Sequence, residues 1–284
     1  MGYIAKGGTG NNLWVDGDYI YAANGSDGLR VYTFNEIEDF DNVGHIDEGG
    51  STNDVWGDGT HIYVANSSDL RAYTFNGTTF TPKGDIATLD SLVGVVGDGS
   101  WIYVARDDGY LEAYEHTGGT SFTFKKRINV STSGRGIWFD GGSIYFAGFG
   151  SGLFAYTFNG TDFTPKGSID SGGAAMRTWS DGTYIYLGNF SDGVRAYEHT
   201  SGTSFTPKGH IDSGIHVGVW GDGTYIYSVT GFNGLRAYTF NEIDDFDDVG
   251  DIDNGQENMA CWGDGTYIYV LSGTNGGLYA YAFR

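Results

Sequence analysis

The sequence predicts an all-β protein, a seven-bladed β-propeller of four-stranded antiparallel blades, and three observations lead to this fold class. First, an Asp-Gly dipeptide recurs every 40 to 42 residues, with its aspartate at Asp16, Asp58, Asp98, Asp140, Asp181, Asp222 and Asp264. Second, tryptophan stands two residues before six of these seven aspartates, and Val96 replaces it in the third unit. Third, 16% of the 284 residues are aromatic and 49 are glycine, a composition that suits short strands joined by tight turns. Repeats of this length are typical of propeller blades.

One unit, residues 175–214, shows the four strands in order. Residues 176–180 are predicted to form the short inner strand. The Asp181-Gly182 turn joins this strand to a second strand at 183–188. A loop at 190–193 leads to a third strand at 194–198, and a turn at 199–203 leads to a fourth at 204–211. Apolar and aromatic residues occupy both faces of these strands, as expected where each blade packs against two neighbours.

The two ends of the chain predict how the ring closes. The last unit ends at 280–284 in its third strand, so it lacks a fourth. Residues 2–7, Gly-Tyr-Ile-Ala-Lys-Gly, align with the fourth-strand pattern Phe-Thr-Pro-Lys-Gly and are predicted to complete that blade. Such a shared strand leaves no raw edge between the first and last blades. We therefore expect a single propeller domain over residues 1–284.

The strands of the repeat resemble those of known propeller families. The segment IYVAN at 62–66, followed by LRAY at 70–73, resembles the YVTN propeller repeat, and the LRAY strand is similar to the LVIVD-type repeat, although no LVIVD-Pro motif is present. The resemblance covers the whole chain as repeats. It implies the propeller fold and a binding or surface role, because such repeats are often found in surface proteins. Fold analogy alone does not assign a function.

The charge of the chain limits its expected partners. The formal net charge of −21 would repel nucleic-acid backbones and anionic membrane surfaces, so we expect neither nucleic-acid binding nor membrane insertion. The N-terminal residues lack the apolar stretch of a signal peptide. The compartment stays open, with an extracellular or particle-surface location suspected, and a monomer is expected. The single cysteine, Cys261, excludes an intramolecular disulfide.

The candidate site is the segment four to seven residues before each turn aspartate, which varies between units where the strands do not. This segment links the outer strand of one blade to the inner strand of the next, so the copies are expected to converge around one mouth of the central channel. The residues predicted to bind a ligand there are Asn12, Asn53, Asp54, Arg135, Arg177, His216, Glu257 and Asn258. They form either a polar pocket or a solvated rim whose loops varied freely.

A metal site is the alternative to a plain binding pocket. Asn12, Asn53, Asp54, Glu257 and Asn258 offer oxygens of the type that Ca²⁺ accepts. They resemble the Glu/Asn/Asn/Asp set of calcium-dependent propeller lactonases and phosphotriesterases, which mostly have six blades and further motifs that are missing here. The alternative function is therefore a calcium-dependent hydrolase with its site at the channel. Otherwise no cofactor is expected, and no catalytic residue is assigned.

Aromatic loop residues support binding as the leading prediction. Phe149, Phe190 and Phe232 lie in loops between second and third strands, on the same face as the channel mouth. They could stack on a sugar, anchor a protein or pack over the blade edge. We predict a non-enzymatic propeller that binds a protein or glycan partner through this face, or that serves as a structural subunit of a larger particle.

Two repeated charged features are interpreted as structural. Four arginines share one third-strand position, where stem packing and cation–π stacking between blades are favoured over a ligand-binding ring; they are Arg30, Arg71, Arg195 and Arg236. Acidic runs at 36–41 and 242–248 occupy turns between third and fourth strands and are interpreted as solvated edges.

Overall fold

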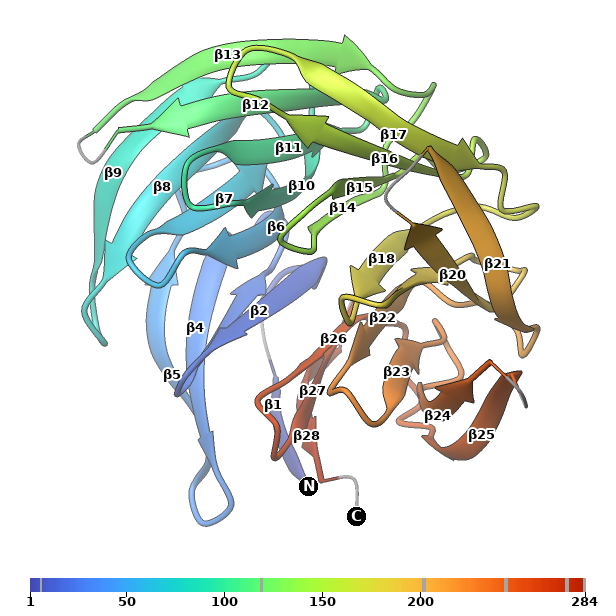
Figure 1. The fold of residues 1–284 in the computed structure, drawn as a ribbon. Helices are drawn as coiled ribbons and strands as arrows, with labels where there is room; N and C mark the ends of the chain where they lie inside the picture. Colours follow the sequence, from blue (N-terminus) through green and yellow to red (C-terminus); the bar gives the residue numbers. More distant parts are fainter. Residues whose placement is uncertain (6, 118–119, 201–202, 243–244, 274–275, 283–284) are drawn as a thin grey trace.

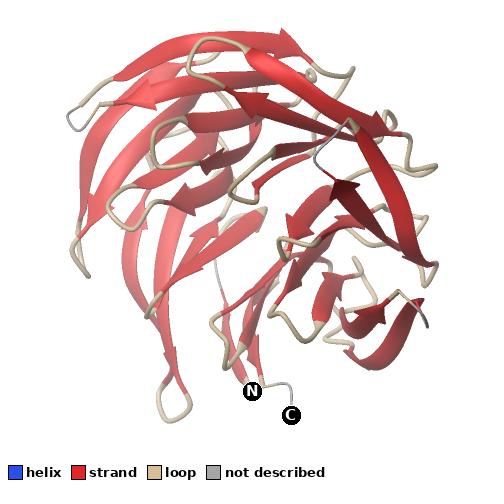
Figure 2. Ribbon diagram, viewed as in Figure 1, coloured by secondary structure: helices blue, strands red, loops and turns tan. Residues whose placement is uncertain are grey.

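The computed structural model describes residues 1–5, 7–117, 120–200, 203–242, 245–273 and 276–282. These residues form 28 strands in seven four-stranded antiparallel sheets that are arranged as a ring (Figure 1). The described part of the chain contains no helix, and therefore none that could cross a membrane (Figure 2). The predicted all-β, seven-bladed propeller is confirmed.

The strands of blades 1 to 6 run outward from the channel in chain order. Blades 1 to 3 consist of β2 (Asn12–Asp16), β3 (Tyr19–Ala23), β4 (Leu29–Asn35), β5 (Asp39–Ile46), β6 (Thr52–Gly57), β7 (Ile62–Asn66), β8 (Asp69–Phe75), β9 (Phe80–Ala87), β10 (Leu92–Gly97), β11 (Ile102–Arg106), β12 (Tyr110–His116) and β13 (Phe122–Asn129). Blades 4 to 6 consist of β14 (Gly136–Phe139), β15 (Ile144–Ala147), β16 (Leu153–Phe158), β17 (Phe163–Ile169), β18 (Arg177–Ser180), β19 (Tyr184–Gly188), β20 (Val194–Thr200), β21 (Ser204–Ile211), β22 (Gly218–Gly221), β23 (Ile226–Val229), β24 (Leu235–Asn241) and β25 (Asp245–Ile252). Blade 7 consists of β26 (Asn258–Gly263), β27 (Ile268–Ser272), β28 (Gly277–Tyr281) and β1 (Gly2–Ala5).

The N-terminal strand closes the ring, as predicted. β1 pairs antiparallel with β28, with Gly2 opposite Ala280 and Ala5 opposite Gly277. Ile4 packs against the hydrophobic cluster shared by blades 1 and 7. Blade 7 is thus completed by residues from the opposite end of the chain. Of the predicted closing segment, Lys6 lies outside the described residues.

Six of the seven turn aspartates connect their hairpin to the second strand through hydrogen bonds. In blade 5, one carboxylate oxygen of Asp181 accepts the backbone N–H groups of Thr183 and Tyr184, both at 2.7 Å, and the other accepts the Tyr186 hydroxyl at 3.0 Å. Gly182 between them has φ 90°, where a side chain would be strained. Equivalent bonds surround Asp58, Asp98, Asp140, Asp222 and Asp264. The repeated Asp-Gly is therefore a structural element of the blade.

The tryptophans that recur before the turns pack on glycines of the next blade. An added Cβ at Gly221 would lie 2.6 Å from the Trp179 ring, and one at Gly263 would lie 2.6 Å from the Trp220 ring. Trp14 and Trp56 meet Gly57 and Gly97 in the same way. A larger residue at these glycines would displace the indole, so the Trp–Gly pairs set the spacing of the inner strands.

Two tryptophans lack such a glycine and lie in the channel. The residue that would face Trp138 is Ser180, and the residue that would face Trp262 is Val15. Both indoles are half-buried, and their ring centroids lie 5.8 Å apart, although they belong to blades 4 and 7. These two side chains therefore narrow the centre of the ring.

The third-strand arginines bind aspartates rather than aromatic rings, so the expected cation–π stacking is wrong. Arg30 lies 2.5 Å from Asp27, and Arg195 lies 2.5 Å from Asp192. Arg71 and Arg236 likewise pair with Asp69 and Asp248. Each arginine can reach an aspartate of its own blade, and a carboxylate accepts a charge-assisted hydrogen bond that is stronger than the interaction with a ring face.

Candidate functional site

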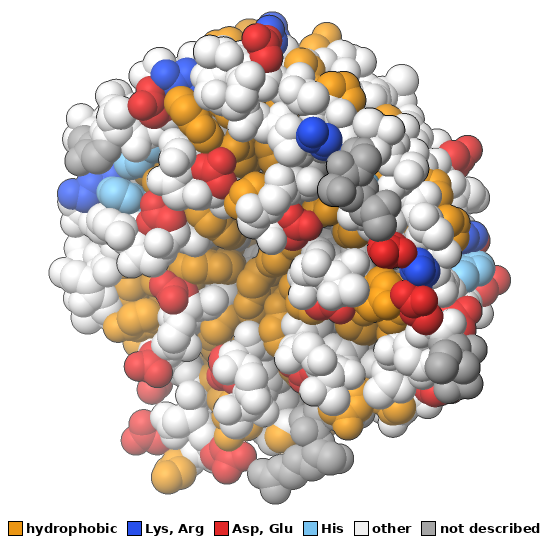
Figure 3. Space-filling view, in the orientation of Figure 1, with side chains coloured by type: hydrophobic (Ala, Val, Ile, Leu, Met, Phe, Trp, Pro, Cys, Tyr) orange, Lys and Arg blue, Asp and Glu red, His pale blue; other side chains and the backbone are white. Residues whose placement is uncertain are grey.

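The central channel opens on two faces of the ring. The linker face carries the segments that join successive blades and the loops between second and third strands, and the turn face carries the Asp-Gly turns. At the turn face, a hollow of ≈ 660 Å³ is lined by Trp138, Trp179, Trp220 and the turn residues of blades 4 to 7. Figure 3 shows hydrophobic side chains at the centre of the ring with acidic side chains around them.

At the linker face, the fifth residue before each turn aspartate contributes to one ring of side chains. This mouth ring consists of Asn11, Asn53, Val93, Arg135, Met176, Val217 and Met259, one from each blade. Together with Arg177 these residues line a cavity of ≈ 190 Å³, which we call the vestibule. Its wall is polar on blades 1, 2 and 4 and apolar on blades 3, 5, 6 and 7.

The polar members of the mouth ring also connect adjacent blades. The side-chain amide of Asn11 donates to the Thr52 carbonyl at 2.9 Å, and that of Asn53 donates to the Leu92 carbonyl at 2.7 Å. Arg135 donates to Asp107, and its guanidinium lies over the Phe149 ring at 4.9 Å from the centroid. These contacts hold the polar wall in place.

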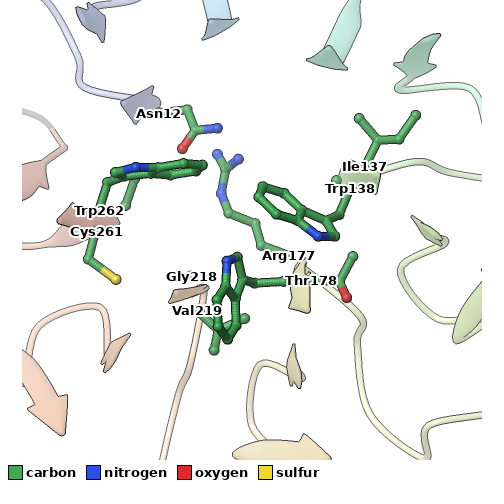
Figure 4. Close-up of a pocket in the computed structure, with 12 residues that line it drawn as sticks. Asn12, Ile137, Trp138, Arg177, Thr178, Gly218, Val219, Cys261 and Trp262 are labelled. Atoms are coloured by element: carbon green, nitrogen blue, oxygen red, sulfur yellow. The ribbon is translucent and has the colours of Figure 1, made fainter. Parts of the chain in front are cut away.

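One residue further into the channel, a second ring contains Arg177. Its other members are Asn12, Asp54, Gly94, Gly136, Gly218 and Ala260. The small residues leave room for the arginine, whose Nη2 crosses from blade 5 to donate to the Asn11 carbonyl of blade 1 at 2.8 Å. Figure 4 shows the guanidinium pointing toward Asn12, with the indoles of Trp138 and Trp262 on either side. A cavity of ≈ 50 Å³ remains beside it.

Asp54 is the buried acid of this second ring. One of its oxygens accepts from Asn12 and from the Val55 backbone N–H at 2.9 Å, and the other accepts from the Val95 N–H at 2.8 Å. Burial raises the pKa of Asp54, and the positive charge of Arg177 and these hydrogen bonds oppose that rise. Burial also lowers the pKa of Arg177, which the Asp54 charge opposes. The two charges balance each other across the channel.

Three of the predicted site residues, His216, Glu257 and Asn258, lie in neither the vestibule nor the second ring. His216 is fully buried, and its ring nitrogens bond the Ser213 and Ser228 hydroxyls at 2.9 and 2.8 Å. Burial lowers the pKa of His216 to about 4. Asn258 is also fully buried and accepts from the Ser272 hydroxyl at 2.9 Å. The backbone carbonyl of Glu257 accepts from the Gly273 N–H at 2.6 Å.

The difference from the sequence prediction is one of register. Asn53, Arg135 and Arg177 line the vestibule, and Asn12 and Asp54 lie just inside it. His216 and Asn258 stand one residue before the mouth-ring members Val217 and Met259, at a position that is buried in all blades. A fixed count of five residues back from the turn aspartate would have identified the apolar wall.

Four of the five predicted oxygen ligands form side-chain hydrogen bonds with other protein groups. Asn12 and Asp54 bond each other, Asn53 bonds the chain of blade 3, and Asn258 bonds within blade 7. Within the described ranges, no group of three or more His, Cys, Asp or Glu side chains is placed to hold a metal ion. Calcium-dependent hydrolysis therefore stays an untested prediction.

Apolar side chains of blades 4 to 6 are exposed on the linker face. Phe149, Phe190 and Phe232 are 38%, 36% and 70% exposed, and Ile215 is 41% exposed. We call these four the phenylalanine patch. Phe149 and Phe190 have φ 46° and 51°, at positions where blades 1 and 6 carry Gly25 and Gly231 with φ 57° and 58°. Bulky residues rarely adopt this conformation, so the two phenylalanines are strained as well as exposed.

Comparisons with known proteins identify the fold. No family model and no curated protein matches the sequence, so the YVTN or LVIVD type of repeat stays a prediction. A chain in a crystal structure of the Mitotic Checkpoint Complex is similar with a TM-score of 0.80 at 14% identity, over 96% of this chain and 90% of that one. The computationally designed Ika8 protein is similar with a TM-score of 0.70 at 6% identity, over 98% of both chains. At such identities the likeness establishes a β-propeller and nothing finer.

Proposed function

We propose that this propeller is a binding module that holds a protein partner on its linker face, through the phenylalanine patch and the adjoining vestibule. The observation that carries the proposal is the pair Phe149 and Phe190. Each presents a partly exposed aromatic ring from a left-handed backbone position that glycine fills in two other blades. Strain that a simple substitution would relieve indicates a use for the side chain.

The composition of the patch favours a protein over a glycan. It is made of three phenylalanines and an isoleucine, and the most exposed, Phe232, lies in the same kind of loop as the other two. Aromatic and aliphatic anchors of this kind dominate the energetics of protein interfaces. The vestibule beside them adds a concave surface with amide and guanidinium groups.

The test compares a patch variant with a matched surface variant. Phe190→Ser with Phe232→Ser removes two anchors, and Ile37→Ser with Phe124→Ser removes two other exposed apolar side chains, 95% and 48% exposed, that lie outside the patch. We expect cross-links to a captured partner to map to residues 149–152, 190–193 and 230–234, and capture to fall at least about ten-fold for the patch variant only.

Two outcomes would contradict the proposal. Equal capture by both variants would show that the patch is not the interface. Binding to a glycan array that the patch variant loses, together with no captured protein, would show that the partner is a glycan and not a protein.

A further inference from the structure

The vestibule contains an arginine whose hydrogen-bonding capacity is mostly unused. Resting on the function proposed above, we propose that the vestibule binds a carboxylate carried on an apolar body, with the Arg177 guanidinium as the group that receives the carboxylate. The ligand is therefore an organic acid with an aliphatic or aromatic tail, presented either as a free small molecule or as an acidic group of the bound partner.

Arg177 differs from the other arginines of the described chain. Each of the others lies within 4.0 Å of a carboxylate; they are Arg30, Arg71, Arg106, Arg127, Arg135, Arg195 and Arg236. Among the residues that the structure describes, Arg177 forms one hydrogen bond, to a backbone carbonyl, although a guanidinium has five N–H donors. Arg177 is half-buried and lines the vestibule, so its remaining donors are available to a ligand that enters there.

Asp54 does not complete those bonds. Its two oxygens accept three N–H donors from Asn12, Val55 and Val95. It balances the charge of Arg177 from a distance but leaves the donors open. The guanidinium lines both the vestibule and the smaller cavity below it, so an acid that enters from the linker face meets those donors at the end of its path.

The rest of the vestibule fits the apolar body of such an acid. Met176, Val217 and Met259 supply a continuous apolar wall from blades 5, 6 and 7, and Val93 of blade 3 adds an apolar side chain on the far side of Arg135. Methionine side chains adapt to ligands of different outline. On the opposite side, Asn11 and Asn53 are fixed by their bonds to neighbouring blades, and Arg135 adds a second positive charge. An acid with its carboxylate at Arg177 and its apolar tail against Met176 and Met259 would fit the polar and apolar sides of the vestibule.

The methionines provide a direct probe. The chain has three, and Met176 and Met259 line the vestibule while Met1 lies on the surface. We would titrate benzoate, and separately benzyl alcohol, into protein labelled with ¹³C at the methionine methyl groups. We expect the Met176 and Met259 signals to shift with benzoate and the Met1 signal to stay, with benzoate at least about ten-fold tighter than the neutral alcohol.

Two variants assign the head group. Arg177→Gln should abolish the shift, and Arg195→Gln, which removes an outer arginine of the same blade, should leave it unchanged. If Arg177→Gln does not fold, Met176→Glu keeps the arginine and places a negative charge in the apolar wall, so the Met259 signal should no longer respond. Shifts that persist in Arg177→Gln or in Met176→Glu, equal affinity for the alcohol, or no shift at all with benzoate would overturn the proposal.

A second arm separates the two sources of the acid and separates this proposal from the function on which it rests. Peptides ending in phenylalanine are titrated with a free and with an amidated C-terminus. A free-acid peptide that shifts both methionines at lower concentration than benzoate points to a partner's acidic group, and tight binding of benzoate alone points to a free acid. Capture that depends on Phe190 and Phe232 while benzoate and both peptides fail would refute the carboxylate site only; the reverse would refute the protein-binding proposal only.

Discussion

The turn-face and linker-face ends of the channel are formed by the same inner strands but differ in what their side chains contact. At the turn face, Trp179 and Trp220 lie on Gly221 and Gly263, and six of the turn aspartates, Asp181 among them, bond the backbone and a tyrosine or loop group of their own blade. At the linker face, the mouth ring changes from asparagine to valine, arginine or methionine around the circle. The Trp–Gly contact recurs at four blade interfaces, whereas the mouth-ring residue differs from blade to blade.

This difference between the two faces places residues for stability and residues for recognition only a few positions apart in the same part of the chain. In blade 5, Met176 and Arg177 line the vestibule, and Trp179 and Ser180 line the hollow at the turn face. If this comparison is right, substitutions at the turn face should lower stability, and substitutions at the linker face should alter binding with a small effect on stability.

The largest expected effect comes from Trp179→Ala, compared with Met176→Ala in the same strand region. Trp179 is 8% exposed and stacks on Tyr186 at a centroid distance of 5.8 Å, so its loss leaves a cavity between blades 5 and 6. We expect a loss of about 3–5 kcal/mol for Trp179→Ala and less than about 1 kcal/mol for Met176→Ala, which already borders open space. Chemical denaturation of the two variants measures both losses in unfolding free energy. Equal losses would contradict the division of roles between the turn face and the linker face.

The next effect is a pH dependence at the linker side. The pKa of His216 is lowered to about 4 by burial, from an ordinary value of 6.5. The unfolded chain therefore takes up a proton at His216 before the folded protein does, so stability is lost as pH falls from 6.5 toward 4, by up to about 3 kcal/mol.

Replacement of His216 isolates this contribution. His216→Gln should flatten stability between pH 6.5 and 4, and His45→Gln, at a largely exposed histidine, should not. Burial raises the pKa of Asp58, but hydrogen bonds from the His61 and Thr60 backbone outweigh it and lower that pKa below 3.8. The stability that Asp58 contributes is therefore lost at a lower pH than the His216 contribution. An unchanged slope in His216→Gln would show that another group titrates in this window.

The repeat made the turn face predictable from sequence. Asp-Gly pairs and tryptophans recur at fixed intervals, the aspartate bonds hold in six blades, and the Trp–Gly contact holds at four blade interfaces. The linker face was predictable only in location. Whether His216 or Val217 faces the channel depends on a shift of one residue, because neighbouring side chains in a strand point in different directions. The reach of Arg177 also depends on small residues of other blades, Gly94 and Gly136 among them, which no local pattern reveals.

A third, smaller effect tests the Trp–Gly packing directly. Gly221→Ala places a methyl group 2.6 Å from the Trp179 ring and 3.0 Å from the Tyr225 carbonyl, so the indole must move. We expect a loss of about 1–3 kcal/mol, as for other overpacked cores. Gly150→Ala is the control, because an added Cβ there has no atom within 4 Å. Thermal unfolding of the two variants should differ by several degrees, and identical curves would show that the indole has freedom to move.

The smallest expected change in stability is at Phe190→Gly, and its size separates a binding residue from a packing residue. Glycine relieves a left-handed backbone at φ 51°, which costs an ordinary residue roughly 1–2 kcal/mol, and this gain offsets the loss of the ring's buried part. The net change in unfolding free energy should stay within about 1 kcal/mol, whereas Phe205→Ala, at a phenylalanine of the same blade that is 8% exposed, should cost about 3–5 kcal/mol. A loss for Phe190→Gly as large as that for Phe205→Ala would mean that the ring serves the blade and that the strain has a structural cause.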